Sequence, residues 1–226
     1  MLKDMDRRES HELLDATDLP DETVAQSYNE LSKVNSFLGN TAAVLRLLRQ
    51  ADPAPRRVLD IGCGHGALLI KIRKELGVDV VGMDLRQAPP EATISIVAGN
   101  AVIDPLPRAD VTVCVLVAHH LSEVDLDALI RNVAQSSRRF ILLDLVRHPA
   151  PLWLFRLFVA PWLNHINRRD GQTSIIRAYT AAEMRRIVDQ ALTGAARPVE
   201  HMRHTVAPFW IRQVVDIQWE PSSLRK

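Results

Sequence analysis

The sequence of 226 residues has few of the features that mark cross-linked or strongly charged proteins. Its two cysteines, Cys63 and Cys114, are too few for a disulfide framework or a zinc cluster, and they fit a reducing, cytoplasmic compartment. The formal net charge of +1 gives no large field to attract nucleic acid or an anionic membrane. Arginine pairs at 56–57, 138–139 and 168–169 are isolated, so we expect no nucleic-acid partner.

Long apolar runs are also missing. The first fifteen residues are charged and lack the apolar core of a secretion signal. The most apolar stretch, 152–166, is shorter than the roughly 20 residues of a spanning helix, so no stable membrane insertion is expected. Without repeats or low-complexity tracts, the length suits one domain at 21–226 after a flexible tail at 1–20, as a monomer or a homodimer.

The most informative segment is residues 58–72, which read VLDIGCGHGALLIKI. The apolar residues around Asp60 predict a buried strand, and residues at helical spacing after the glycines predict a helix. Between them, Gly62, Gly64 and Gly66 predict a tight turn, because glycine permits positive φ and lets a ligand approach the backbone closely. The segment therefore predicts a site for a nucleotide-like ligand.

Two ligand classes fit the glycine spacing. Gly62, Gly64 and Ala67 match the dinucleotide pattern G-x-G-x-x-G/A, and Asp84 follows at about the distance where a ribose-binding acid belongs. Asp60 distinguishes the two classes, because a carboxylate so close to the turn would repel a pyrophosphate. A cofactor with a cationic sulfonium and an ammonium group would be tolerated or favoured.

The same run resembles motif I of class I S-adenosylmethionine-dependent methyltransferases, (V/I)LDxGxGxG, at every defining position. The resemblance spans most of residues 20–218 and implies S-adenosylmethionine as the cofactor. The stretches VNSFLGN at 34–40 and DGQTSIIRAYT at 170–180 are similar to bacterial enzymes of phenolic and polyketide natural-product biosynthesis and of quinone pathways. Two alternatives stay open: an NAD(P)-dependent oxidoreductase, and a scaffold that binds the cofactor without transferring methyl.

Alternating strand and helix patterns predict an α/β fold with a Rossmann-like, doubly wound, seven-stranded sheet that is mostly parallel. Strands are expected at 58–61, 78–83, 92–98, 110–117, 139–146, 198–206 and 209–219, with helices at 122–135 and 180–192. The last two strands have no helix between them and predict a C-terminal antiparallel hairpin, as methyltransferase sheets have. Thr180 and Glu183 have the spacing of a capping box.

Two segments lie outside this pattern, and by the resemblance we expect both to form a helical cap over the substrate. Segment 22–50 is expected to hold two helices broken near Gly39, and segment 149–178 contains the aromatic-rich stretch 152–166. That stretch favours a lid over an apolar pocket, and hence an aromatic or lipophilic acceptor. Core packing and an interfacial membrane helix are the alternatives.

Candidate cofactor ligands follow the strands, because open α/β sheets bind ligands beyond the carboxyl ends of their strands. Asp60 and the glycine turn are assigned to the methionine portion, Asp84 to the ribose diol, and the residues after the second and third strands to adenine. The full set is Asp60, Gly62, Cys63, Gly64, Gly66, Asp84, Leu85, Gly99, Asn100, Ala101 and Ala118. Asp84 could instead cap a turn, and Asn100 could be a solvated loop residue.

His119 and His120 follow the fourth strand and are the candidate catalytic residues, since a neutral histidine can take a proton from a phenol. A role in orienting loops fits them as well. No metal is expected, because adjacent histidines splay apart and no carboxylate stands at ligand spacing in the sequence. The candidate acceptor-binding residues are Trp153, His165, Arg177 and Tyr179. We expect methyl transfer to a small hydroxylated aromatic acceptor, with O-methylation favoured over C-methylation.

Overall fold

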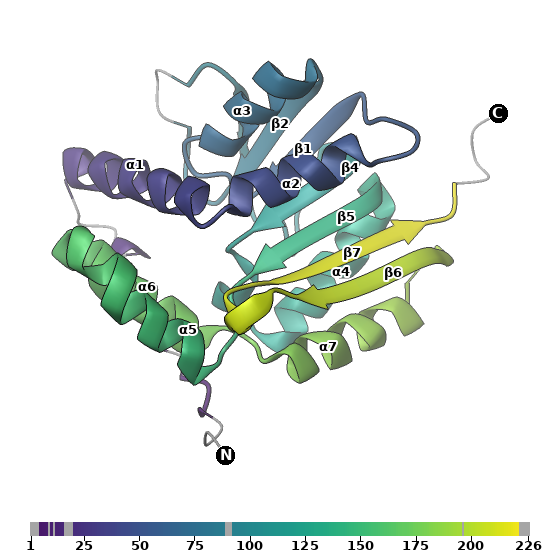
Figure 1. Cartoon of the computed structure of the whole chain (residues 1–226). Helices are drawn as coiled ribbons and strands as arrows, with labels where there is room; N and C mark the ends of the chain where they lie inside the picture. The colour runs from purple at the N-terminus through teal and green to yellow at the C-terminus, as the bar shows by residue number, and fades with distance from the viewer. Residues whose placement is uncertain are drawn as a thin grey trace.

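The structure, a computed structural model, describes residues 5–8, 10, 12–15, 20–88, 92–195 and 197–221. Within these ranges the chain forms a seven-stranded sheet of order β3-β2-β1-β4-β5-β7-β6, with helices on both faces (Figure 1). Strands β1 to β5 pair in parallel, whereas β7 is antiparallel to both β5 and β6. The expected doubly wound sheet with a C-terminal antiparallel hairpin is confirmed.

The elements have the following bounds. The strands are β1 Arg57–Ile61, β2 Asp79–Asp84, β3 Ser95–Ala98, β4 Ala109–Val115, β5 Ser137–Asp144, β6 Val199–Val206 and β7 Gln213–Trp219. The α-helices are α1 Asp21–Phe37, α2 Asn40–Arg49, α3 Ala67–Leu76, α4 Glu123–Ser136, α5 Pro149–Leu154, α6 His165–Arg177 and α7 Ala181–Thr193. The short helices are η1 Leu13–Asp15, η2 Ala118–His120, η3 Phe155–Val159 (a π-helix), η4 Ala160–Trp162 and η5 Pro208–Trp210.

Each face of the sheet has its own apolar core, because successive side chains of a strand point to opposite faces. On β1, Val58 packs with residues of α2 and α3, whereas Leu59 and Ile61 pack with residues of α4 and α7. Figure 1 shows α2 and α4 on opposite sides of the sheet. Burial on both faces holds the central strands rigid, so the residues at their carboxyl ends have fixed positions.

Three strands are shorter than their apolar patterns predict. β4 ends at Val115 instead of 117, because Leu116 has a φ of 58° and leaves the extended conformation. β7 begins at Gln213 instead of 209, because the chain first forms η5, in which Phe209 has a φ of 58°. β3 begins only at Ser95. An apolar pattern does not reveal a left-handed backbone, so the predicted end of β4 and the predicted start of β7 are wrong.

Two local signals of the sequence are confirmed. Gly39, with a φ of 74°, separates α1 from α2, as the predicted break requires. The capping box of α7 is present, since Thr180 accepts a hydrogen bond from the Glu183 amide while the Glu183 carboxylate accepts one from the Thr180 amide. Both signals are local, so neighbouring residues alone determine them.

Helices α1, α5 and α6 lie beyond the carboxyl ends of the parallel strands (Figure 1). Glu30 on α1 joins two of them, because its carboxylate accepts hydrogen bonds from the Asn164 amide at 3.2 Å and the Asn167 side chain at 2.7 Å. The described part of the N-terminal segment reaches the same region. There the amides of Leu13 and Leu14 donate to Asp170 of α6 at 2.7 and 2.8 Å.

Among the described residues, no helix combines the length and the apolar character that a membrane crossing needs.

Candidate functional site

The glycine turn follows β1 directly and leaves no room for side chains. Gly62, Gly64 and Gly66 have φ angles of 69°, 52° and 77°, a region that other residues rarely adopt. A Cβ at Gly62 would lie 2.3 Å from Cγ2 of Val117, and one at Gly66 would lie 2.1 Å from Cδ1 of Ile94. Gly66 is also the N-cap of α3, so the first amide groups of that helix face the turn. The backbone conformation and the packing against neighbouring side chains therefore both require glycine at these positions.

Asp84, at the carboxyl end of β2, is joined to this turn. Its carboxylate accepts hydrogen bonds from the Gly64 amide at 2.8 Å and the Arg86 amide at 3.0 Å. An ionised carboxylate has about four acceptor positions, so two positions remain for a ribose diol. Asp84 thus acts as a turn cap in the structure, and that role is compatible with binding ribose.

Asp60 is buried in the middle of the sheet, in register with Gly82 of β2 and Val113 of β4. Burial, and secondarily the negative charge of Asp84, raises the pKa of Asp60 well above its ordinary value. A cation beside Asp60 would stabilise the ionised form, whereas a phosphate would destabilise it further. The electrostatics of this site favour a positively charged ligand.

The candidate adenine contacts lie after β2 and β3. Leu85 is 76% exposed, so its side chain is open to a flat ligand. The Gly99 amide donates to the backbone carbonyl of Asp84 at 2.9 Å, which holds the two strand ends together. Asn100 uses its side-chain oxygen to accept from the Val102 amide at 3.0 Å, so it orders the turn that contains the half-buried Ala101.

Two further candidates are more enclosed. Cys63 lies inside the glycine turn, where burial raises the pKa of its thiol, so the group is a neutral thiol and a poor nucleophile. Ala118 begins η2 and is buried in the core formed with α4 and α7. Each can contact a ligand only through its backbone or a small apolar surface.

His119 is held by Asp144, the last residue of β5. Its Nδ1 lies 2.7 Å from one carboxylate oxygen of Asp144, and its backbone amide donates to the other at 2.8 Å. His119 is buried, whereas the side chain of His120 is 29% exposed. The two rings do not splay apart, because their centroids are 4.3 Å apart at an interplanar angle of 38°. The expectation that adjacent histidines splay apart is therefore wrong.

Glu12, from the N-terminal segment, completes this cluster. Its Oε1 lies 3.7 Å from Nε2 of His119 and 3.8 Å from Nε2 of His120. The same oxygen accepts a hydrogen bond from the Ser174 hydroxyl at 2.7 Å and lies 3.9 Å from a guanidinium nitrogen of Arg177. No sequence signal pointed to Glu12, because it is far from the histidines in the chain and belongs to no motif.

The four candidate acceptor-binding residues occupy different environments. Arg177 lies beside the histidine pair and donates to the His120 carbonyl at 3.4 Å. Tyr179 is buried, its hydroxyl donates to the Leu121 carbonyl at 2.8 Å, and burial raises its pKa to about 12. Trp153 and His165 are exposed on α5 and at the start of α6. The structure therefore brings only Arg177 into contact with the histidine cluster.

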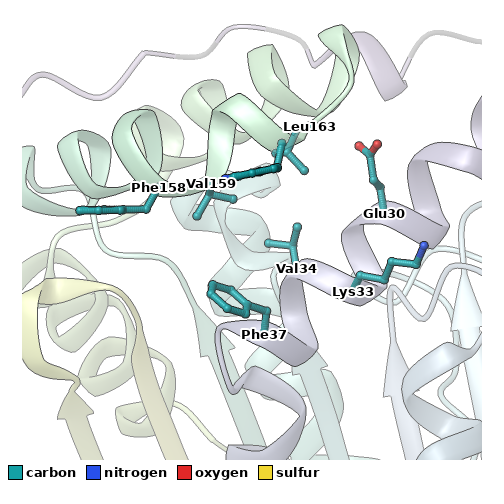
Figure 2. A pocket seen from close by; sticks show the side chains of 8 residues that line it. Glu30, Lys33, Val34, Phe37, Phe158, Val159 and Leu163 are labelled. Carbon is teal, nitrogen blue, oxygen red and sulfur yellow. The ribbon is translucent and has the colours of Figure 1, made fainter.

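An apolar pocket of about 380 Å³ lies between α1 and the segment η3–η4. Figure 2 shows Val34 and Phe37 of α1 facing Phe158, Val159 and Leu163. The complete lining is Glu30, Lys33, Val34, Phe37, Phe158, Val159, Trp162 and Leu163. Apolar groups thus form most of the wall, with one acidic and one basic residue beside them.

Tyr28 connects the pocket helix with the glycine turn, and the sequence analysis missed it. A Cβ at Gly64 would lie 3.0 Å from Cε1 of Tyr28, and the Tyr28 and His65 ring centroids are 4.6 Å apart. Helix α1 therefore covers the turn at one point and lines the pocket further along.

Comparison with known proteins gives a consistent result. A family model described as a methyltransferase domain matches residues 34–191, more than half of the chain. The plantazolicin methyltransferase BpumL, solved with a monoazolic desmethylPZN analog and SAH, is 13% identical with a TM-score of 0.66, over 89% of this chain and 91% of that one. The related BamL is 11% identical with a TM-score of 0.69, over 89% and 92%.

Human N-acetylserotonin methyltransferase in complex with SAM is 14% identical with a TM-score of 0.55, over 83% of this chain and 53% of that one. At such identities these likenesses show the fold. A search of curated proteins gave no match.

Proposed function

Because the chain belongs to the S-adenosylmethionine-dependent methyltransferases, we propose that it transfers the cofactor's methyl group to a hydroxyl oxygen of a small aromatic or lipophilic acceptor. The observation that carries this proposal is the apolar pocket between α1 and η3–η4, next to the helix that covers the glycine turn. Such an acceptor fits a cytoplasmic enzyme of natural-product biosynthesis.

The cofactor is assigned to the carboxyl edge of the sheet. Asp60 and the turn at 62–66 receive the methionine portion, and Asp84 receives the ribose hydroxyls. The surface formed by Leu85 and the turn at 99–101 receives adenine. The raised pKa of Asp60 supports this orientation, since the sulfonium and ammonium groups would compensate the buried carboxylate.

The position of the pocket supports a small acceptor. Val34 follows Tyr28 by six residues on α1, which corresponds to about 9 Å along the helix axis. The same helix therefore contributes to the pocket and contacts the glycine turn about 9 Å away along its axis. The apolar lining favours an aromatic or lipophilic body.

The reaction requires few catalytic groups from the protein. Attack of the acceptor oxygen on the methyl carbon breaks the carbon–sulfur bond, and the thioether leaves without an acid. The main task of the protein is to hold oxygen and methyl in line at close distance. His119 and His120 follow β4 at the same carboxyl edge of the sheet and are assigned to orienting the hydroxyl. Their presence favours oxygen over carbon as the methylated atom.

The direct test uses S-adenosylmethionine with an isotopically labelled methyl group. The full chain is incubated with a panel of phenols and lipophilic alcohols, each paired with an analogue that lacks the hydroxyl. We expect label only in hydroxylated members, on oxygen as located by NMR. Label on ring carbon, or transfer to the hydroxyl-free analogues, would overturn O-methylation. A chain that binds the cofactor and labels no acceptor would contradict the proposed acceptor class.

A further inference from the structure

Three ligand-type side chains from two separate parts of the chain converge at the carboxyl edge of the sheet. Nε2 of His119, Nε2 of His120 and the carboxylate of Glu12 lie within 4.8 Å of one another. The separations of 3.7 and 3.8 Å from Oε1 of Glu12 to the two nitrogens exceed the 2.7–3.2 Å of a hydrogen bond. Ligands of a tetrahedral ion, with bonds of roughly 2.0–2.1 Å, are about 3.3 Å apart. The cluster is spaced more like metal ligands than like hydrogen-bonded pairs.

The contacts of His119 lead to the same interpretation. Asp144 accepts hydrogen bonds from the amides of His119 and Leu145, and its carboxylate lies 2.7 Å from Nδ1 of His119. With Nδ1 held by Asp144, the other ring nitrogen, Nε2, is the one that lies near Glu12, at 3.7 Å. The ring of His119 is therefore fixed with Nε2 toward the centre of the cluster.

We propose that Glu12, His119 and His120 bind a divalent transition-metal ion of the zinc type. Two imidazole nitrogens and one carboxylate oxygen are a donor set that suits zinc. Asp144 supplies the outer carboxylate that commonly orients a metal-binding histidine. Burial of Glu12 and His119 shields the site, and the partial exposure of His120 leaves a path for the ion.

The charges near the cluster allow a cation. Glu12 and Asp144 are two carboxylates. Among the described residues, Arg177 approaches the Glu12 oxygen at 3.9 Å, and Arg7 donates to the backbone carbonyls of His119 at 3.4 Å and Leu121 at 2.8 Å. Before the ion enters, the two carboxylates therefore match the two guanidinium groups in number. The Ser174 hydroxyl holds the Glu12 oxygen in place at 2.7 Å and does not compete for the histidines.

This inference deepens the proposed function and rests on it for its role. Three protein ligands leave a fourth position for water or for the acceptor oxygen, and a bound hydroxyl loses its proton more readily. The hydroxyl would release its proton to solvent, and the oxygen would then form its bond to the methyl carbon as the carbon–sulfur bond breaks. Such a site would select acceptors whose hydroxyl can reach the ion.

Cobalt provides a test that does not depend on activity. The tag-free full chain, purified without chelators, is titrated with Co²⁺ while the visible absorption of the ion is recorded. We expect one Co²⁺ per chain with the intense absorption of a four-coordinate site, displaced by Zn²⁺. Glu12→Gln and His120→Gln should each weaken Co²⁺ binding at least about tenfold. The controls are Glu200→Gln and His201→Gln, which change the same residue types on the exposed surface of β6.

Calorimetry with adenosylhomocysteine on the same samples shows whether each variant is folded and binds cofactor. A folded wild type without Co²⁺ absorption, or site variants that bind Co²⁺ as the controls do, would overturn the metal site. Methyl transfer to hydroxylated acceptors would then still support the proposed function. Conversely, stoichiometric Co²⁺ binding without any such transfer would contradict the proposed function and leave the metal site standing.

Discussion

Single residues determine which ligand charge the site favours, and Asp60 is the clearest case. Its pKa is raised in the folded protein, so above the ordinary value of 3.8 the folded state binds more protons than the unfolded state. The contribution of Asp60 to stability is therefore favourable at low pH and is lost as pH rises through the folded pKa. Burying the ionised carboxylate costs free energy in the ligand-free protein, and a bound cation offsets that cost.

Asp60→Asn should consequently stabilise the ligand-free protein at neutral pH and weaken its binding of S-adenosylmethionine. Cofactor binding should lower the pKa of Asp60 in the wild type, because the cation favours the ionised carboxylate, so protons are released at pH values where the ligand-free carboxyl is protonated. Calorimetry in two buffers of different ionisation enthalpy measures that release. Equal release from wild type and Asp60→Asn would assign the proton to another group.

Asp84→Ala should weaken cofactor binding by about 1–3 kcal/mol, because it removes the proposed acceptor for the ribose hydroxyls. Asp84→Asn keeps one acceptor oxygen and should lose less. Asp79→Asn, at the exposed opposite end of the same strand, is the matched control and should bind as the wild type does. An unchanged dissociation constant for Asp84→Ala, measured with adenosylhomocysteine, would remove Asp84 from the site.

Some residues at the carboxyl edge of the sheet could be predicted from the sequence, and others could not. The three glycines, Asp60 and Asp84 belong to one sequence pattern. Their spacing along the chain predicts that they lie together at the ends of the first two strands. Glu12 and Tyr28 reach the same region from segments that precede the first strand, and only tertiary packing brings them there. Their residue types and neighbours carry no periodic signal.

At the scale of elements, local chemistry predicts where helices begin better than where strands end. The capping box of α7 follows from two side chains on one turn, whereas the ends of β4 and β7 depend on left-handed residues in the loops beside them. An apolar residue can have an extended or a left-handed backbone, so its type does not show where a strand ends. This is why the strand positions were predicted correctly and several strand ends were not.

Thr180→Ala should lower the free energy of unfolding by about 1 kcal/mol, since it removes the side-chain acceptor for the Glu183 amide. Urea denaturation gives the value directly. Thr193→Ala is the control, because its hydroxyl donates to the Asp189 carbonyl at the exposed end of the same helix. If Thr193→Ala lowers the free energy of unfolding as much as Thr180→Ala does, the capping hydrogen bond does not account for the effect at Thr180.

The pocket between α1 and η3–η4 makes a second prediction at this scale. Phe158→Ala should raise KM for a lipophilic acceptor several-fold and leave the dissociation constant of adenosylhomocysteine unchanged, because Phe158 lines only the pocket. Phe209→Ala removes a comparably exposed ring of η5 that is not part of the lining. If both variants behave alike in steady-state kinetics, the acceptor does not bind in this pocket.

At the scale of the whole molecule, the seven-stranded, mostly parallel sheet and its terminal hairpin could be predicted, since alternating patterns permit few topologies. The arrangement above the sheet could not, because it depends on contacts between distant residues such as Glu30 and Asn167.

A ligand at the carboxyl edge should stabilise the entire fold. At one hundred times its dissociation constant, adenosylhomocysteine should add about 2.7 kcal/mol to the free energy of unfolding. NADH at equal concentration should add nothing in the same urea titration.

The long-range contacts of the N-terminal segment limit when the protein can complete its fold during synthesis. Arg7 donates to the carbonyl of Arg177, 170 positions away, and Leu13 donates to Asp170, 157 positions away. Because translation proceeds toward the C-terminus, Arg7 and Leu13 can make these contacts only after α6 has been synthesised. A nascent chain that ends before α6 would lack the Ser174 hydroxyl that holds the Glu12 carboxylate, so the cluster of Glu12 with the two histidines is completed late.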